Sequence, residues 1–373
     1  MNDTLQDMMR EATRLTQAGH LTEATALIQR ALSGSKTPTV ASPQSASAAP
    51  LIVDGIVLNR SIDADATNPN PNPNPNPNAD RSASASDSGE FISGSHTHSG
   101  LTRAYKLYVP PQSAGRALPL VVMLHGCTQD PDDFAAGTNM NAPAREQGFF
   151  VLYPAQSKES NAQSCWNWFN RAHQLRGSGE PALLADMTQW VMKAYGIDAQ
   201  RVYIAGLSAG GAMADIVAAA YPEIYAAVGV HSGLPRGAAT NVAGAFAVMK
   251  NGLPAARLTA AIKEATVPTI VFHGDADHTV HPDNGEQVIA VLLRGVQSSE
   301  TTLQQGVASG GRGYTRTTYR DDGGLAVAEH WLVKGAGHAW SGGSTKGSYT
   351  DAKGPDATAE MLRFFFEHLL CNR

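Results

Sequence analysis

Residues 201–213, with the sequence RVYIAGLSAGGAM, decide the fold of this chain. Residues 201–205 predict a strand, and the small residues from 211 to 214 predict the start of a helix. The G-x-S-x-G pattern between them requires a sharp turn that strains the backbone of Ser208 and admits only very small neighbours. The first turn of the helix then points its free amides and the positive end of its dipole at the serine. We therefore interpret Ser208 as a nucleophile and not as part of a glycine-rich turn.

Apolar runs alternate with helical patterns through residues 91–373. Residues 103–109 alternate like a strand, and continuous apolar runs occupy residues 118–124, 149–153, 202–205, 226–230 and 269–272. Helical patterns occupy residues 181–195, 209–221, 284–293 and 356–370. A continuous apolar run is typical of a strand buried on both faces, and strands that alternate with helices form a parallel sheet. We therefore expect a mostly parallel sheet flanked by helices.

Residues 125–129, HGCTQ, follow the apolar run that ends at residue 124. The loop after such a strand supplies one amide of an oxyanion hole, and the residue after the nucleophile supplies the other. We assign these two donors to the backbone amides of Cys127 and Ala209. His125 is expected to shape the loop and not to act as a base. No neighbour in the sequence indicates a lowered pKa for the Cys127 thiol, so it is not a nucleophile candidate.

The catalytic acid and base are expected further along the chain. Residues 272–280, FHGDADHTV, begin at the end of an apolar run and offer two aspartates. We choose Asp277 as the acid, because HG-x-x-D-x-x-V is the recurring form of this loop. Asp275 remains the alternative, and its other interpretation is a turn cap. His338 lies between small residues on a loop after the strand of residues 330–333, which suits a base that must reach the nucleophile.

The order of these three residues along the chain indicates the fold family. Ser208, Asp277 and His338 follow one another as in the α/β-hydrolase fold, and the other serine-hydrolase orders differ. The sequence therefore predicts an α/β-hydrolase domain with Ser208 as nucleophile, His338 as general base and Asp277 as the acid that orients the base.

Composition and motifs argue against other classes of partner and cofactor. The net charge of −5 gives no basic footprint for nucleic acid, and no apolar run approaches the roughly 18 residues of a membrane span. No phosphate-loop or dinucleotide fingerprint is present, so we expect no cofactor. We also expect no metal, because one acidic and histidine-rich cluster lacks the spacing of metal ligands: Asp275, Asp277, His278 and His281.

The first 90 residues differ in character from the rest. Apolar residues recur at helical spacing in residues 1–34, with a break at Gly19-His20, which predicts an αα-hairpin like a single tetratricopeptide-type unit. One such unit cannot bury its own apolar face, so it must dock, self-associate or hold a partner. Residues 35–90 are rich in Ser, Pro and Asn and predict a largely disordered, semi-stiff linker.

The beginning of the chain and its three cysteines bear on the compartment. The first residues lack both the basic and the apolar region of a secretory signal, so we expect a cytoplasmic protein, with export by a non-standard route as the alternative. Cys127, Cys165 and Cys371 allow one disulfide and a free thiol, or three free thiols. For a cytoplasmic protein the reduced state is favoured, and the pairing stays open.

Six segments of the chain resemble the polyhydroxybutyrate depolymerase family of esterases, which is related to feruloyl and acetylxylan esterases. They are YKLYVP at 105–110, HGCTQ at 125–129, CWNWF at 165–169, the elbow at 201–213, the loop at 273–280 and GHAW at 337–340. The resemblance covers roughly residues 91–370.

This resemblance implies a substrate class. It implies hydrolysis of ester bonds in short-chain polyhydroxyalkanoates or their oligomers through an acyl-enzyme. Trp166, Trp168 and Trp340 are candidates to line the substrate cleft, with Trp340 favoured because it lies two residues from the base. The other interpretation of these residues is an ordinary core or rim position. Secreted depolymerases that attack solid polymer usually carry a signal peptide and a polymer-binding domain. We find neither here, which favours oligomers, amorphous polymer or small esters.

Two alternative functions stay open. One is a feruloyl or acetylxylan esterase that acts on plant-derived esters. The other is a non-catalytic interaction protein built on a hydrolase fold, with the N-terminal hairpin as its binding element. The complete set of Ser208, Asp277 and His338 argues against the non-catalytic alternative.

Overall fold

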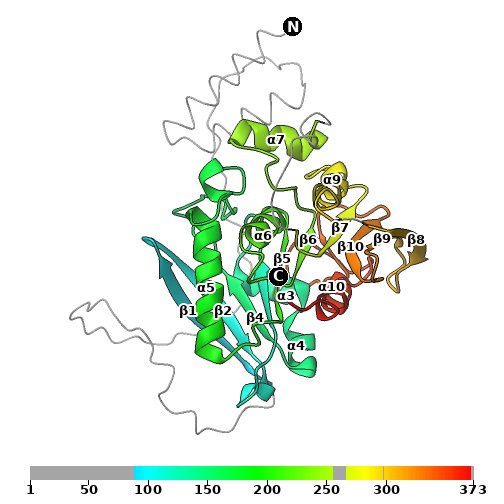
Figure 1. Ribbon diagram of the computed structural model, residues 1–373. Helices are drawn as coiled ribbons and strands as arrows, with labels where there is room; N and C mark the ends of the chain where they lie inside the picture. The colour runs from blue at the N-terminus through cyan, green and yellow to red at the C-terminus, as the bar shows by residue number, and fades with distance from the viewer. Residues whose placement is uncertain (1–87, 255–265, 297, 371–373) are drawn as a thin grey trace, which may run out of the picture. The chain divides into compact units, whose positions relative to one another are not determined.

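The computed structural model describes residues 88–370, apart from residues 255–265 and residue 297 (Figure 1). The predicted hairpin of residues 1–34 and nearly all of the predicted linker of residues 35–90 lie outside the described residues. Cys371 lies outside them as well.

The described residues build a large sheet with its parallel strands in the middle. Its strands are β1 (Glu90–His98), β2 (Leu101–Val109), β3 (Leu120–Leu124), β4 (Phe150–Pro154), β5 (Val202–Leu207), β6 (Ala227–His231), β7 (Thr269–Gly274), β8 (Glu300–Val307), β9 (Gly313–Arg320) and β10 (Ala326–Val333). Their order in the sheet is β1-β2-β4-β3-β5-β6-β7-β10-β9-β8. The strands from β4 to β10 in this order run parallel, while antiparallel pairs form both edges. The mostly parallel sheet predicted from the apolar runs is confirmed.

Helices cover both faces of this sheet. They are α3 (Pro131–Thr138), α4 (Asn141–Gln147), α5 (Gly179–Tyr195), α6 (Ala209–Ala220), α7 (Val242–Asn251), α9 (Asp283–Leu292) and α10 (Ala357–Phe366), with short 3-10 turns η1 (Pro111–Ser113) and η2 (Arg171–His173). A small two-stranded sheet pairs β11 (Trp340–Ser341) with β12 (Thr350–Asp351). Every predicted helix within residues 91–370 has a counterpart among them, with ends that differ by a few residues.

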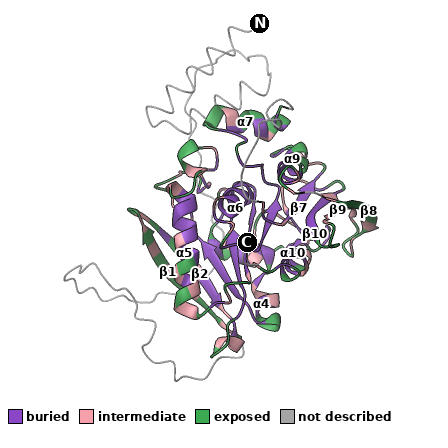
Figure 2. Cartoon of the chain, in the orientation of Figure 1, coloured by how far each residue is buried: buried purple, intermediate pink, exposed green. Residues whose placement is uncertain are grey.

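Alternate residues of the central strands feed two separate hydrophobic cores, because successive side chains of a strand point to opposite faces. Val122 of β3 belongs to the core shared with α5, α6 and α9. Its neighbour Met123 belongs to the core shared with α3, α4 and α10. Figure 2 shows the result, with buried residues along the central strands and in α6, and exposed residues on β1 and β8.

The parallel strands place the predicted site residues at one edge of the sheet. The loops after β3, β5, β7 and β10 carry Cys127, Ser208, Asp277 and His338, respectively. The carboxyl-terminal ends of parallel strands all lie on the same side of the sheet, and ligands of α/β proteins bind just beyond these strand ends. This topology is what brings together residues more than a hundred positions apart.

Candidate active site

The turn around Ser208 has the geometry that its motif predicts. Ser208 has φ 58° and ψ −119°, in the left-handed half of conformational space, and it caps the N-terminus of α6. A Cβ on Gly206 would lie 2.4 Å from the backbone of Gly210, and a Cβ on Gly210 would lie 2.0 Å from the Leu124 carbonyl oxygen. Real Cβ atoms do not approach that closely, so the strand, the turn and the helix pack together only with glycine at both positions.

Asp277 and His338 form a hydrogen-bonded pair. The Nδ1 atom of His338 lies 2.7 Å from Oδ2 of Asp277. The other carboxylate oxygen accepts the backbone amides of Thr279 and Val280, each at 2.9 Å. Burial would raise the pKa of Asp277, but hydrogen bonds with His273 and His338 outweigh it and hold that pKa far below its ordinary value. The carboxylate is therefore ionised at neutral pH and accepts a hydrogen bond from the Nδ1–H group of His338, which leaves Nε2 as the nitrogen with the free lone pair.

The geometry separates the two competing aspartates. Asp275 accepts the backbone amide of Gly335 at 2.6 Å, and no hydrogen bond joins it to His338 among the described residues. The loop of Asp277 and the loop of His338 also pack in direct backbone contact, because a Cβ on Gly274 would lie 2.2 Å from the Ala336 carbonyl oxygen. Asp275 therefore ties the acid loop to the histidine loop, while Asp277 meets the imidazole.

Ser208 and His338 are neighbours of a common residue, His231, which the sequence analysis missed. The amide of Ser208 donates to the carbonyl oxygen of His231 at 2.8 Å, and the amide of Ser341 donates to Nε2 of the His231 ring at 2.9 Å. Burial holds the pKa of His231 well below its ordinary value, and nearby His273 and His338 lower it further. His231 is thus a neutral acceptor that fixes the histidine segment beside the nucleophile turn. Its only sequence signal is a histidine at the end of an apolar strand.

No hydrogen bond joins the Ser208 hydroxyl to His338 in the part of the chain that the structure describes. In hydrolases without substrate this contact is often long and tightens only in the complex with substrate. Ser208 is 8% exposed, and the His338 side chain is 12% exposed, so each keeps a small accessible surface.

The loop after β3 lies against the nucleophile. A Cβ on Gly126 would lie 3.6 Å from Cβ of Ser208. Among the described residues, no acceptor binds the backbone amide of Cys127 or that of Ala209, the two predicted oxyanion donors. His125 is buried and does not point at the nucleophile; Nδ1 lies 2.8 Å from the Gly126 carbonyl oxygen, and Nε2 accepts the backbone amide of Gln156 at 3.0 Å. Its contacts agree with the predicted loop-shaping role.

Cys127 and Cys165 form a disulfide, so the expectation of reduced cysteines is wrong for this pair. The two residues are 38 positions apart, and the sequence alone gave no sign that their loops meet. The fold brings the loop after β3 against the segment that precedes α5. The covalent bond consequently fixes the residue whose amide is an oxyanion-donor candidate.

The three tryptophans expected to line the substrate cleft are buried, which corrects that expectation. Trp166 is 0% exposed, Trp168 is 4% exposed and Trp340 is 1% exposed. The Trp340 ring stacks on His231 and donates to the Thr358 hydroxyl of α10, so it packs the core between the site and that helix. With so little exposed surface, the three tryptophans offer no wall to a ligand.

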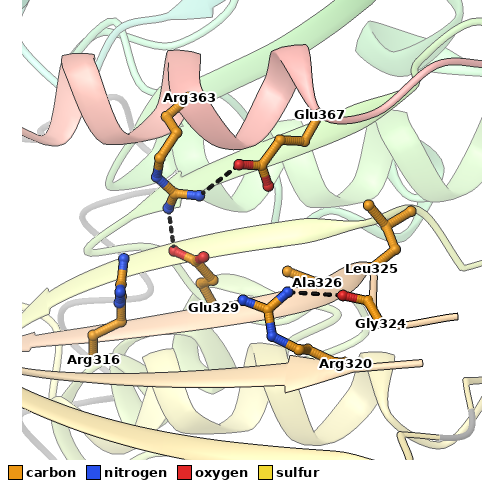
Figure 3. Close-up of a pocket in the computed structure, with 8 residues that line it drawn as sticks. All are labelled: Arg316, Arg320, Gly324, Leu325, Ala326, Glu329, Arg363 and Glu367. Atoms are coloured by element: carbon orange, nitrogen blue, oxygen red, sulfur yellow. Dashed lines mark hydrogen bonds and ion pairs between the residues drawn. The ribbon is translucent and has the colours of Figure 1, made fainter. Parts of the chain in front are cut away.

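One surface cavity of about 530 Å³ lies away from this site (Figure 3). It opens near the start of β10, where Glu329 pairs with Arg363 of α10, whereas the candidate site follows the other end of that strand. Within the described residues, no group of three or more His, Cys, Asp or Glu side chains has the arrangement of a metal site. None of the described helices is long and apolar enough to cross a bilayer.

Comparison with known sequences decides the family. The sequence model described as Esterase PHB depolymerase matches residues 103–308, more than half of the chain. The chain belongs to this family. Poly(3-hydroxyalkanoate) depolymerase C of Paucimonas lemoignei is 31% identical over 256 residues, which cover 66% of this chain and 60% of that protein. The resemblance seen in the six sequence segments is thereby confirmed.

Other relatives carry different names. Feruloyl esterase B of Neurospora crassa is 29% identical over 248 residues, which cover 62% of this chain and 81% of that protein. Probable acetylxylan esterase A of Aspergillus flavus is 28% identical over 196 residues, which cover 48% of this chain and 62% of that protein. The chain spans 50 to 62% of the length of the depolymerase and acetylxylan esterase relatives.

Solved structures agree on the fold. The acetyl xylan esterase from Aspergillus awamori superposes with a TM-score of 0.57 at 19% identity, covering 74% of this chain and 99% of that one. Identity at this level speaks for the fold alone. The domain accordingly has the α/β-hydrolase fold, as the order of the site residues predicts.

Proposed function

We propose that this member of the Esterase PHB depolymerase family is a serine carboxylesterase that works through an acyl-enzyme on Ser208. The observation that carries the proposal is the 2.7 Å hydrogen bond between His338 and Asp277, at the same sheet edge as the strained turn of Ser208. An ionised, buried carboxylate that holds one imidazole nitrogen leaves the other as a base for a nearby hydroxyl.

The proposed reaction has two halves. Nε2 of His338 takes the hydroxyl proton as Oγ of Ser208 attacks the ester carbonyl carbon, and the amides of Cys127 and Ala209 stabilise the resulting oxyanion. The tetrahedral intermediate collapses, the ester C–O bond breaks, and the imidazolium gives its proton to the leaving alcohol. Water then attacks the acyl-enzyme with His338 again as base, and the carboxylic acid leaves Ser208 with its proton restored.

We propose short-chain polyhydroxyalkanoate, or its soluble oligomers, as the substrate. The family model and the depolymerase relative support this class. Feruloyl or acetylxylan esters are the second candidate, supported by the feruloyl and acetylxylan esterase relatives at nearly the same identity. A panel of 3-hydroxybutyrate oligomers, polymer film, methyl ferulate and acetylated xylan separates the two by kcat/KM.

The test of the proposed chemistry is the Ser208→Ala variant. With p-nitrophenyl butyrate as substrate, turnover should fall to the background rate while the melting temperature stays near that of the wild type. A non-catalytic interaction protein would leave both proteins equally inactive, and hydrolysis retained in the variant would place the nucleophile elsewhere.

Two further proposals concern the compartment of the protein and its self-association. The disulfide between Cys127 and Cys165 supports an oxidising compartment, and hence the export alternative over the cytoplasmic expectation. The helical spacing in residues 1–34 supports self-association through that segment. Light scattering on the full chain and on a variant without residues 1–34 tests the second proposal, since only the full chain should exceed the monomer mass.

A further inference from the structure

A fully buried carboxylate, Glu180, lies behind the oxyanion loop in the first turn of α5. Its oxygens accept hydrogen bonds from Gln156 Nε2 at 2.5 Å and from the amide and side chain of Asn167 at 2.7 Å and 2.8 Å. The guanidinium of Arg103 lies 3.5 Å away. Burial would raise the pKa of Glu180, but contacts with His173, Gln156 and Asn167 outweigh it and lower that pKa, so the group is ionised.

The first of two connections from Glu180 to the oxyanion loop passes through Gln156. The side chain of Gln156 is fixed from both ends, because Nε2 donates to Glu180 and Oε1 accepts Arg103 Nε at 2.8 Å. Its backbone amide donates to Nε2 of His125 at 3.0 Å. Since Nε2 is an acceptor, the proton of the neutral ring is on Nδ1 and is donated to the Gly126 carbonyl oxygen at 2.8 Å.

That carbonyl belongs to the same peptide unit as the amide of Cys127. In a trans peptide the C=O and N–H bonds point in opposite directions, so a fixed carbonyl fixes the direction of the amide. The burial of His125 lowers its pKa, and the ring keeps the neutral form that these two contacts require. The hydrogen bonds therefore set the direction in which the oxyanion donor points.

The second connection passes through the segment of residues 165–168. Glu180 holds Asn167 by its backbone amide and its side chain, and Gln156 Nε2 also donates to the Cys165 carbonyl oxygen at 2.9 Å. Cys165 is joined to Cys127 by the disulfide. Through Gln156 and Asn167, Glu180 therefore holds the segment of Cys165, the disulfide partner of Cys127. Through Gln156 and His125, it also holds the peptide unit that carries the Cys127 amide.

We propose that Glu180 is a positioning residue of the oxyanion hole, acting through Gln156 and His125 on one side and through Asn167 and the disulfide on the other. This inference rests on the proposed esterase function, because it assigns Glu180 a role in stabilising the transition state. It is distinct from a purely structural role, in which the same contacts would maintain only the folded state.

The test is the Glu180→Gln variant, which keeps the size of the side chain. Besides His173, whose Nδ1 lies 3.5 Å from Oε2, four donor groups surround the carboxylate: Gln156 Nε2, Asn167 Nδ2 and Arg103 at Oε1, and the Asn167 backbone amide at Oε2. The new NH₂ group therefore faces a donor in either orientation. Removing one oxyanion donor costs about 10²- to 10³-fold in kcat, and a misdirected donor should cost about tenfold, with KM within about twofold. The Ki of a trifluoromethyl ketone, whose adduct with Ser208 needs the oxyanion hole, should rise by the same factor as kcat falls.

The matched control is Glu329→Gln. Glu329 is also buried, at 2% exposure, and pairs with Arg363 at 2.6 Å at the distant cavity of Figure 3. This variant should lower the melting temperature and leave kcat and the trifluoromethyl ketone Ki unchanged. Unchanged kcat and Ki in Glu180→Gln, or equal losses in both variants, would overturn the proposal.

A second variant covers the case in which Glu180→Gln does not fold. Asn167→Ala removes one side-chain donor to Glu180 and leaves the carboxylate bound to Gln156, and it should lower kcat by a smaller factor with KM retained. An unchanged kcat in this variant would refute the inference. Full turnover in Ser208→Ala would instead refute the proposed function, so the two failures are distinguishable.

Discussion

A Cβ at Gly274, the last residue of β7, should separate Asp277, the proposed catalytic acid, from His338. In the Gly274→Ala variant the new methyl group would lie 2.2 Å from the Ala336 carbonyl oxygen and 2.9 Å from that of Gly337. Both are backbone atoms, so no side chain can turn aside to make room. The loop that carries His338 must therefore move by about 1 Å relative to the loop of Asp277, because Cβ contacts do not fall below 3.0 Å.

The expected loss of activity follows from that shift. The bond between Asp277 and His338 is 2.7 Å long, and a displacement of about 1 Å at a reacting group costs about 10²-fold in rate. We expect kcat/KM for p-nitrophenyl butyrate to fall by about that factor, with far-ultraviolet circular dichroism unchanged at the assay temperature. Gly244→Ala, in helix α7, is the matched control, because its Cβ would meet its nearest neighbour at an ordinary 3.4 Å. Wild-type kcat/KM in a folded Gly274→Ala variant would refute the reasoning.

Three further predictions follow from the site. Asp277→Asn should lower kcat by about 10⁴-fold, because an amide no longer holds the imidazole in the required tautomer. Because the pKa of Asp277 is lower in the folded state than in the unfolded state, its carboxylate stabilises the folded state fully above about pH 4 and progressively less as the pH falls below that value. The difference in melting temperature between the wild type and Asp277→Asn should therefore shrink below about pH 4. Cys165→Ser, which breaks the bond to Cys127, should lower the free energy of unfolding by about 2–5 kcal/mol in a denaturant titration, and a smaller kcat should accompany it. Trp340→Phe should lower the free energy of unfolding by about 1–3 kcal/mol and leave KM unchanged. A raised KM would instead indicate that Trp340 contacts the substrate.

The sequence predicted those elements of the fold that have a recognisable pattern within one continuous segment. The apolar runs located β3 to β7, and the strand predicted at residues 330–333 falls within β10; these strands are buried on both faces. Strands β1, β8 and β9 were missed: β1 and β8 are the two edge strands and have largely exposed side chains, and β9 lies next to β8 with side chains that are mostly half-buried. Such strands are held chiefly by backbone pairing with a neighbour, as in the register of Glu90 with Val109, and a single sequence does not encode that pairing as a pattern.

The same distinction holds within the candidate site. The turn of Ser208 requires a local motif with glycines at fixed positions, so the sequence predicted it in detail. The disulfide of Cys127 and Cys165 and the contacts of Glu180 and His231 depend on loops that meet only in three dimensions. Trp340 lies next to the histidine loop in sequence, yet its ring turns into the core towards α10, a direction that sequence proximity does not reveal.

The most direct measurement of the central claim is active-site labelling of the full chain with a fluorophosphonate, followed by peptide mapping. One label per chain should appear on the peptide that contains Ser208, and esterase activity should vanish in proportion to its occupancy. Hydrolysis of esters that persists in fully labelled protein, or a label that resides on another serine while activity is lost, would contradict the assignment.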